Sequence, residues 1–586
     1  MYLRKSKKKS GRVYLTIVEG YRDERGKNMS RTIESLGYVD DFQRQGIADP
    51  IAHFTEECAR RNEERRSETA PVVVKIPPRQ KIDKRDRGAQ IELGAAVVDG
   101  YLNRDLGLLD FFERRRTARK ASFDPYRVLE LLVWDRIAHP SSKRSAWEGR
   151  GRFPRKCPFS LDDTYRALTY LEERARELVL HMNESIEGAR GPRDATRLYY
   201  DVTNYYFEVE DEDGFRMHGV SKENRRSPIV QMGLFLDADG IPLDYALFPG
   251  NVPDVSTLVP AMEQAGVRSG ERVVVVADKG LNASANIARC VLDRNGFIFS
   301  QSVRGADAGL KGWVLSEDGY ESNGSGTYRI KSRQAERAVY VTGADGRRRQ
   351  VKIPVKQVAF WSRDFAERSR REREKVIEKS LRSLERGDAG RAFARSSARY
   401  AKATPVDPET GEVGRLAWAL DEAAIAQDAR YDGYYCIITS EVDMGDGEII
   451  DAYRGLWKIE ESFRVIKGDL GARPVFCSTE THIRAHFLIC FIALVVMRLI
   501  QADVERGTGS RPSAAAVQEA LSGIVGHRLD ENHWLFDYRT DLTDALGGAA
   551  GVDLTRRALS KGQVRDIMAA MRKPKPREVV HQQKRH

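Results

Sequence analysis

Two aspartates stand in stretches of the sequence where a charged side chain is costly to bury. Asp201 lies in the middle of the run RLYYDVTNYYFEV, and Asp278 closes the apolar run VVVVA. A buried carboxylate needs a hydrogen-bonding partner or a metal ion, because leaving water otherwise costs too much free energy. Asp278 also follows a buried strand, where open α/β sheets place their ligands. Each aspartate alone is weak evidence, because a strand-end aspartate is about as often a helix cap or a turn residue.

A third acid lies in a segment with the pattern of a helix, GEIIDAYRGLWKIEESFRVIKGDLG, which begins at residue 447. At about 100° per residue, positions seven apart nearly coincide, so Tyr453, Glu460 and Lys467 are predicted to form one stripe. Trp457 and Arg464 flank this stripe. Such a face could hold a metal beside a phosphate backbone while an aromatic ring stacks on a base.

The alternative interpretation of this segment is a solvated helix held by ion pairs. In that case Glu461, rather than Glu460, could be the paired acid. Other polar residues favour structural roles: we expect Asp237 and Asp254 in turns, and His218 and His486 as loop and packing residues.

The composition favours a polyanionic partner. Lys and Arg number 97 against 86 Asp and Glu, for a net charge of +11, and basic side chains on a phosphate backbone release condensed counterions. A basic protein without such a partner is the alternative. Six widely spaced cysteines without a CxxC pair argue against structural zinc and disulfides and favour a reducing cytoplasm. We expect no signal peptide, and the apolar run at 487–497 is too short to span a bilayer, so it predicts a buried helix.

The elements that would position the acids begin with a strand-rich region. Runs at 197–209, 229–250, 271–280 and 296–303 predict five strands, because 229–250 reads as a hairpin with its turn at Asp237–Gly240. A crossover helix is predicted at 282–294. The order β-β-β-α-β is the first half of an RNase H-like fold, so the predicted class is α/β.

The flanking regions have other patterns. The first residues predict a β-hairpin with its turn at Asp23–Lys27, followed by a third strand. Asp124-Pro125 is a start signal for a helix that ends before Pro140, and a second helix is predicted to begin at Asp162 and Asp163. Regularity breaks down after 303, where a β-rich insertion with a charged helix is expected, and a strand at 433–441 resumes the buried pattern.

These patterns predict seven segments along the chain. The expected division is a small β region at 1–45, a linker at 46–90, a helical and DNA-binding region at 91–195, the first half of the core at 196–303, an insertion subdomain at 304–430, the second half of the core at 431–505, and a C-terminal helical region with a basic tail at 506–586.

Several motifs together carry a family resemblance. IVEGYRDERGK, YYDVTNYYFE, PGNVPDVSTL, VVVVADKGLNASANI and YRGLWKIEESFRVIK resemble the DDE transposases of bacterial insertion sequences. The branch they resemble most has a Tyr-Arg-Glu-Lys signature and a β-rich insertion before the glutamate. In the signature positions this chain has Tyr453, Glu460 and Lys467, but Leu456 replaces the arginine, so the phosphate contact of that arginine is not expected here.

The resemblance implies a catalytic site of three acids, Asp201, Asp278 and Glu460, which would ligate two Mg²⁺ (or Mn²⁺) ions. It also implies double-stranded DNA, both element ends and target, as the partner of a homo-oligomer (a dimer on DNA), in a cytoplasmic, nucleoid-associated bacterial protein with no membrane partner. The side chains expected to contact DNA are Tyr453, Arg454, Trp457, Arg464 and Lys467.

The chemistry implied by the resemblance is cleavage and strand transfer of DNA, in which the freed 3′-hydroxyl attacks a second strand. Two alternatives stay open. The same core could belong to a nuclease or resolvase that hydrolyses DNA without joining it. A different class is a DNA-binding regulator that binds ends without cutting.

Overall fold

The chain is described by a computed structural model. The described residues are 1–8, 10–22, 28–67, 89–115, 123–220, 227–266, 272–342, 345–385, 400–406, 413–530 and 532–573. The chain divides into two compact units, Met1–Asp83 and Lys84–His586. Each unit is described by itself.

The first unit is a three-stranded antiparallel sheet with two helices. The strands pair in the order β1-β2-β3, and the elements are β1 (Tyr2–Lys7), β2 (Val13–Arg22), β3 (Asn28–Tyr38), α1 (Val39–Arg44) and α2 (Pro50–Ser67). The predicted hairpin is β2–β3, although its expected turn at 23–27 lies outside the described residues. The third strand precedes the hairpin instead of following it, and α2 occupies much of the segment expected to be a linker.

A nine-stranded sheet forms the centre of the second unit, in the order β10-β11-β12-β15-β9-β8-β5-β6-β7. The five strands predicted for the first half of the core are β5 (Arg197–Tyr206), β6 (Ile229–Leu236), β7 (Pro242–Pro249), β8 (Val274–Ala277) and β9 (Gly296–Ser300). They are adjacent in the order β9-β8-β5-β6-β7. The apolar runs become buried strands, because β6, β8 and β9 are buried along their whole length.

Two helices serve the parallel part of this sheet. The pairs β5–β8 and β8–β9 are parallel, so each needs a crossover connection. The predicted crossover helix between β8 and β9 is α10 (Ser284–Leu292). A second helix, α9 (Leu258–Ala265), precedes β8 and was not predicted.

The segment expected to be an insertion contributes strands to the main sheet. Two 15-residue strands, β11 (Tyr328–Thr342) and β12 (Arg348–Ser362), pair with each other, and β12 also pairs with β15 (Tyr434–Thr439). The other elements of this segment are α11 (Ala308–Leu315), β10 (Glu321–Ser322), α12 (Arg363–Glu385), β13 (Ala401–Val406), β14 (Val413–Leu420) and α14 (Glu422–Ala429). Strands β10, β11 and β12 of this segment therefore extend the main sheet, because β12 pairs with β15.

Two helices of the region after residue 91, at Pro125–Ala138 and Leu161–Glu172, begin where the capping signals indicated. The Asp124 side chain accepts a hydrogen bond from the backbone of Tyr126 at the start of α5 (Pro125–Ala138), and Ser160 and Asp163 form a capping box. The single helix expected after Asp162 is two helices, α7 and α8. The helices of this region are α3 (Gly94–Gly100), α4 (Leu108–Arg114), α5, α6 (Lys143–Gly149), α7 (Leu161–Glu172) and α8 (Ala175–Arg190).

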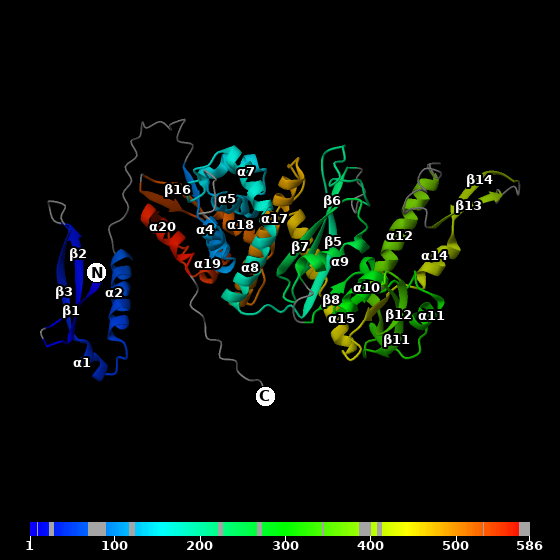
Figure 1. The fold of residues 1–586 in the computed structure, drawn as a ribbon, viewed down its shortest axis with the longest axis horizontal. Coiled ribbons are helices and arrows are strands. Elements are labelled where there is room, and N and C mark those ends of the chain that lie inside the picture. The colour runs from blue at the N-terminus through cyan, green and yellow to red at the C-terminus, as the bar shows by residue number, and fades with distance from the viewer. Residues whose placement is uncertain are drawn as a thin grey trace. The chain divides into compact units, whose positions relative to one another are not determined.

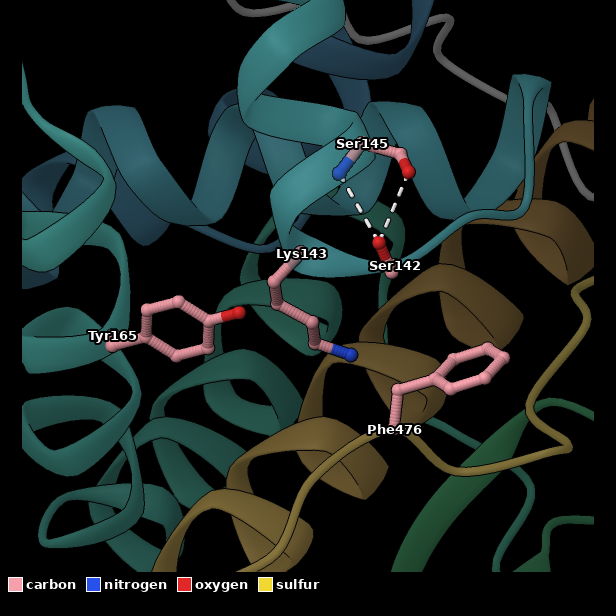
Figure 2. Close-up of a pocket in the computed structure, with 5 residues that line it drawn as sticks. All are labelled: Ser142, Lys143, Ser145, Tyr165 and Phe476. Carbon is pink, nitrogen blue, oxygen red and sulfur yellow. Dashed lines mark hydrogen bonds between the residues drawn. The ribbon is translucent and has the colours of Figure 1, made fainter. Parts of the chain in front are cut away.

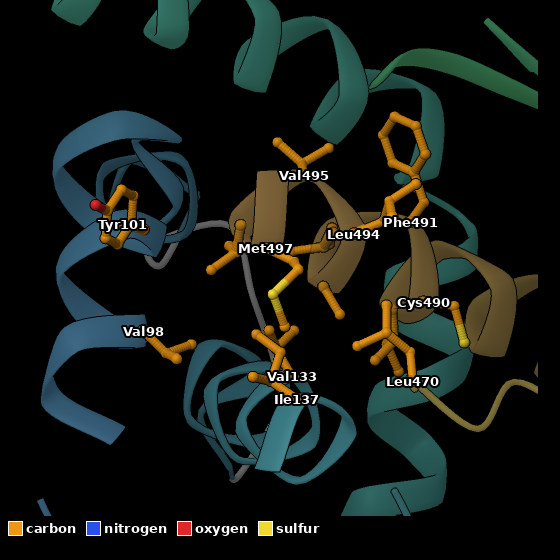
Figure 3. Close-up of a cluster of buried hydrophobic side chains, with 14 of the residues drawn as sticks. Val98, Tyr101, Val133, Ile137, Leu470, Cys490, Phe491, Leu494, Val495 and Met497 are labelled. Carbon is orange, nitrogen blue, oxygen red and sulfur yellow. The ribbon is translucent and has the colours of Figure 1, made fainter. Parts of the chain in front are cut away.

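The long apolar helix α17 (Glu480–Thr508) is the centre of the largest core. It packs against α5, α7, α19 and β7, and Figure 3 shows Met497 pointing toward Val133 and Ile137 of α5. By length and composition alone α17 could cross a membrane, but 94% of its most apolar window is buried inside the fold. This burial resembles that of a core helix in a soluble protein.

The C-terminal elements pack with the helical region. A four-stranded sheet in the order β18-β17-β16-β4 joins residues near 90 to the C-terminal part, as the blue and orange-red strands of Figure 1 show. The elements are β4 (Gln90–Glu92), α18 (Ala514–Gly523), β16 (Val525–Arg528), β17 (His533–Phe536), α19 (Asp541–Ala550), β18 (Ala558–Ser560) and α20 (Lys561–Ala570). The expected basic tail at 574–586 lies outside the described residues.

Candidate active site

Asp201 and Asp278 lie next to each other on neighbouring strands. The parallel strands β5 and β8 pair with Tyr200 opposite Ala277, so the two aspartates follow the same register pair. Residues in register on adjacent strands point to the same face, and the strands are about 4.8 Å apart. Both aspartates are half-buried. The sheet therefore brings two carboxylates together at the carboxyl end of β8.

The Asp278 side chain is held by two hydroxyl groups. Ser300 Oγ, at the end of β9, donates to Asp278 Oδ1 at 2.9 Å, and the Tyr453 hydroxyl donates to the same oxygen at 3.0 Å. Asp278 occupies the cap position of the short helical turn Lys279–Leu281, but its side chain makes no capping hydrogen bond. Asp278 therefore stands at a cap position, but its carboxylate binds Ser300 and Tyr453 instead of the helical turn.

A second tyrosine extends this contact. The hydroxyls of Tyr435 and Tyr453 are 2.6 Å apart. Because the single hydroxyl proton of Tyr453 is donated to Asp278, Tyr435 is the donor between the two tyrosines. Burial raises the pKa of both tyrosines above the ordinary value, so both hydroxyls keep their protons at neutral pH. Tyr435 and Ser300 were not predicted, although a polar residue closing the buried run GFIFS was an available signal.

The helix that carries Glu460 is interrupted. The segment predicted as one helix forms α15 (Asp446–Arg454) and α16 (Trp457–Lys467), joined at Gly455 and Leu456. A side chain on Gly455 would collide with the Tyr199 hydroxyl, which would lie 2.1 Å from the added Cβ. The prediction of one uninterrupted helix is therefore wrong: Tyr453 lies on α15 and reaches Asp278, whereas Glu460 and Lys467 lie on α16.

The structure separates the roles of the two neighbouring glutamates. Glu461 pairs with the buried guanidinium of Arg498 at 3.2 Å, and Arg498 also donates to Ser462 Oγ at 2.9 Å. Glu460 is exposed, and α16 packs across β5, the strand of Asp201. The charge of Glu460, like that of Asp278, contributes to the raised pKa of Tyr435. Glu461 is thus the paired acid, and Glu460 faces the region of the aspartates.

The residue at the arginine position of the signature belongs to the core. Leu456 is 8% exposed and packs in the largest hydrophobic cluster, so an arginine there would have to bury its charge. The other side chains expected to contact DNA lie around α16. Arg454, Trp457 and Arg464 are exposed, and the Lys467 ammonium lies 5.3 Å from the ring centre of Tyr205.

The donor set suits a hard divalent cation, because carboxylate oxygens are the ligands that Mg²⁺ and Mn²⁺ prefer. Among the described residues, no group of three or more His, Cys, Asp or Glu side chains is gathered closely enough to hold a metal ion. The three acids therefore do not form a closed cluster in this structure.

A cavity of about 480 Å³ lies away from these acids, lined by Ser142, Lys143, Ser145, Tyr165 and Phe476 (Figure 2). The Lys143 ammonium is buried and donates to His486 Nδ1, because His486 Nε2 donates to the Ala472 carbonyl at 3.1 Å. Burial lowers the pKa of Lys143 to about 8. His486 is accordingly a packing residue, as the sequence indicated.

Comparison with protein families decides the identity of this core. The family profile described as transposase DDE domain matches residues 194–496, more than half of the chain. The chain belongs to the DDE transposases. The profile of the IS1634 family transposase N-terminal domain matches residues 3–72, which lie in the first unit. The protein is therefore a bacterial insertion-sequence transposase, an enzyme that acts on DNA.

Comparison with individual proteins adds little. The transposase is similar to the cryo-EM structure of a piggyBac transposase synaptic complex with hairpin DNA, at 9% identity and a TM-score of 0.35, over 85% of this chain and 88% of that chain. A likeness this weak supports no conclusion about the transposase. A search of curated proteins gave no match.

Proposed function

We propose that Asp201, Asp278 and Glu460 form the catalytic centre of the transposase, on an RNase H-like core, and that this centre cleaves element ends and joins them to target DNA. The observation that carries the proposal is the register of β5 and β8, which places Asp201 beside Asp278. Support for Glu460 comes from α16, which packs across β5. The Tyr453 hydroxyl, on the preceding helix α15, donates to Asp278.

The three acids would hold two divalent ions, Mg²⁺ or Mn²⁺. When bound, such a pair would activate a water or a 3′-hydroxyl and stabilise the leaving oxygen in an in-line displacement. The residues of the chain position the acids, because Ser300 and Tyr453 both bind Oδ1 of Asp278. Two donors on one oxygen fix the orientation of the carboxylate, so Asp278 would be held in place as one of the residues that bind a divalent ion.

Exposed side chains around α16 would hold the DNA. Trp457 is 53% exposed, an unusual position for an indole, and Arg454 and Arg464 are exposed on either side of it. Arginines bind phosphates and an aromatic ring can stack on a base. We further propose that the transposase works as a dimer on double-stranded DNA and is associated with the bacterial nucleoid. The Tyr-Arg-Glu-Lys branch stays a proposal, because Leu456 departs from its signature.

A strand-transfer assay tests the proposed function against a nuclease. A pre-cleaved element end, offered with supercoiled plasmid and Mg²⁺, should become covalently joined to the plasmid. Hydrolysis of the end without joined products would show a nuclease or resolvase. Binding of the end with neither reaction would show a regulator that does not cut.

Replacing Tyr453 with phenylalanine should slow cleavage about 10- to 100-fold, since a hydrogen bond to a charged group is worth roughly 1.5–3 kcal/mol. The change removes one of the two donors to Asp278 and leaves the ring packing in place. The apparent Mn²⁺ affinity, measured by calorimetry with end DNA present, should fall as well. Tyr435→Phe is the matched control, with a smaller effect because Tyr435 contacts Tyr453 and Ser300 and is not itself one of the two donors to Asp278 Oδ1. Equal rates for Tyr453→Phe and the parent would exclude the positioning role.

A further inference from the structure

The strands β11 and β12 continue beyond the part of the sheet that β15 covers. They pair in register from Tyr328 opposite Ser362 to Thr342 opposite Arg348, whereas β15 pairs only with residues 356–361 of β12. We call residues 336–342 and 345–352 the distal ribbon. Within the described part of the chain, the β12 half of this ribbon has β11 as its sole partner strand. At about 3.3 Å per residue, Arg348 lies about 40 Å along β12 from Trp361.

The two faces of the distal ribbon differ. Val339 and Ile353 are buried in the same hydrophobic cluster as Ile287 of α10, so one face is packed on that helix. Side chains alternate along a strand, and the opposite face carries Tyr340 and Arg348. Tyr340 is 45% exposed, and the Arg348 guanidinium lies 4.4 Å from its ring centre. The packed face makes the ribbon a rigid support for the exposed one.

The exposed face and the tip carry an excess of positive charge. The ribbon has five basic side chains, Arg337, Arg347, Arg348, Arg349 and Lys352, and two acidic ones, Glu336 and Asp345. The acids are already used, because Asp345 pairs with Arg349 at 2.6 Å and Glu336 pairs with Lys352 at 2.9 Å. Of the three exposed arginines at 347–349, Arg349 is therefore compensated by Asp345, whereas Arg347 and Arg348 have no acidic partner among the described residues.

We propose that the distal ribbon is a second DNA contact of the transposase, which binds the phosphate backbone of a duplex away from the three acids. An arginine fork matches a phosphate, and a two-stranded antiparallel ribbon is narrow enough for the major groove. A second copy of the ribbon would not fit as the partner, because two positive tips repel each other. The inference rests on the transposase acting on DNA and not on the assignment of the acids.

The register shows where this duplex would lie. Asp278 is at the carboxyl end of β8, and the pairing through β9 and β15 places Trp361 of β12 near that edge. Arg348, at the start of β12, therefore lies beyond the opposite ends of these strands. A duplex bound there is DNA at a distance from the cleaved bond, and the contact is expected to be independent of sequence because phosphates carry no sequence information.

The test is the salt dependence of DNA binding by Arg347→Gln/Arg348→Gln/Arg349→Gln. Binding to a random-sequence duplex of about 40 base pairs and to element-end DNA is measured by fluorescence anisotropy in EDTA, between about 50 and 200 mM salt. Without metal no strand is cut, so the result does not depend on the three acids. The slope of log K against log salt should become shallower by about 2, since each lost phosphate contact removes about 0.9 and Arg347 and Arg348 are the two arginines without an acidic partner among the described residues.

The matched control is Arg368→Gln/Arg370→Gln/Arg371→Gln on α12, where three exposed arginines lie among acids. Arg371 pairs with Glu367 and Arg370 with Glu374, so its slope should stay close to that of the parent. Arg348→Glu alone should weaken binding more than Arg348→Gln. An unchanged slope for the ribbon variant, or an equal change in the control, would overturn the proposal. Lost self-association with an unchanged slope would also overturn it, in favour of an interface between copies.

Discussion

Asp278→Asn should abolish Mg²⁺-dependent cleavage, a loss of at least about a thousandfold, because a metal-held transition state is worth several kcal/mol. Asparagine keeps the shape of the side chain and can still accept the hydrogen bonds from Ser300 and Tyr453. What it removes is the negative charge that a divalent ion needs. Binding of end DNA, measured by gel shift, should survive.

The neighbouring glutamates give this prediction its sharpest control. Glu460→Gln should match Asp278→Asn in lost cleavage, with little change in stability because Glu460 is exposed. Glu461→Gln should keep cleavage and lower stability, because it weakens the pair with Arg498. The same loss of cleavage is expected for Asp201→Asn. Normal cleavage by Asp278→Asn or Glu460→Gln would show that the residue is not part of the catalytic centre. Lost cleavage by a folded Glu461→Gln would show that Glu461, and not Glu460, is the catalytic glutamate.

Replacing Arg498 with methionine should lower the free energy of unfolding by about 3 kcal/mol, at the low end for a broken buried ion pair. Arg498 is 2% exposed and contacts Glu461, Ser462 and Gln501. Burial lowers the pKa of its guanidinium, but an arginine keeps its charge throughout the neutral range. Methionine fills much of the space and leaves Glu461 only the more distant, exposed Arg464 at 3.7 Å. Glu461 is 26% exposed, so water limits the loss.

Urea denaturation of the second unit, followed by tryptophan fluorescence, measures this effect. Arg506→Met on the same helix is the control, because the Arg506 side chain is 72% exposed and its pair with Asp503 should contribute less than about 1 kcal/mol. Since Arg498 ties α17 to α16, which carries Glu460, cleavage by the folded variant should also slow. Equal stability losses at the two positions would show that the buried pair is not what holds α16.

Much of the fold was predictable because local patterns and burial agree. The apolar runs of β6, β8 and β9 could only be buried strands, and the caps at Asp124 and Ser160 act through neighbouring backbone groups. The helix α9 was missed because its eight residues are too short for a clear periodic signal. The third strand of the first unit was placed on the wrong side because a hairpin pattern does not say which strand the third one joins.

The sequence by itself determined the family and was enough to propose the three acids in their order, since both depend on residue types at local spacing. Only the tertiary structure decided how Asp278 is held, because Ser300 reaches it from the neighbouring strand β9 and Tyr453 from α15, with Tyr435 of β15 behind Tyr453. The same holds for the break before α16: helical periodicity continues through Gly455, and only the approach of Tyr199 from β5 shows why a glycine stands there. Glu460 and Glu461 look alike in the sequence, and the buried charge of Arg498 separates them.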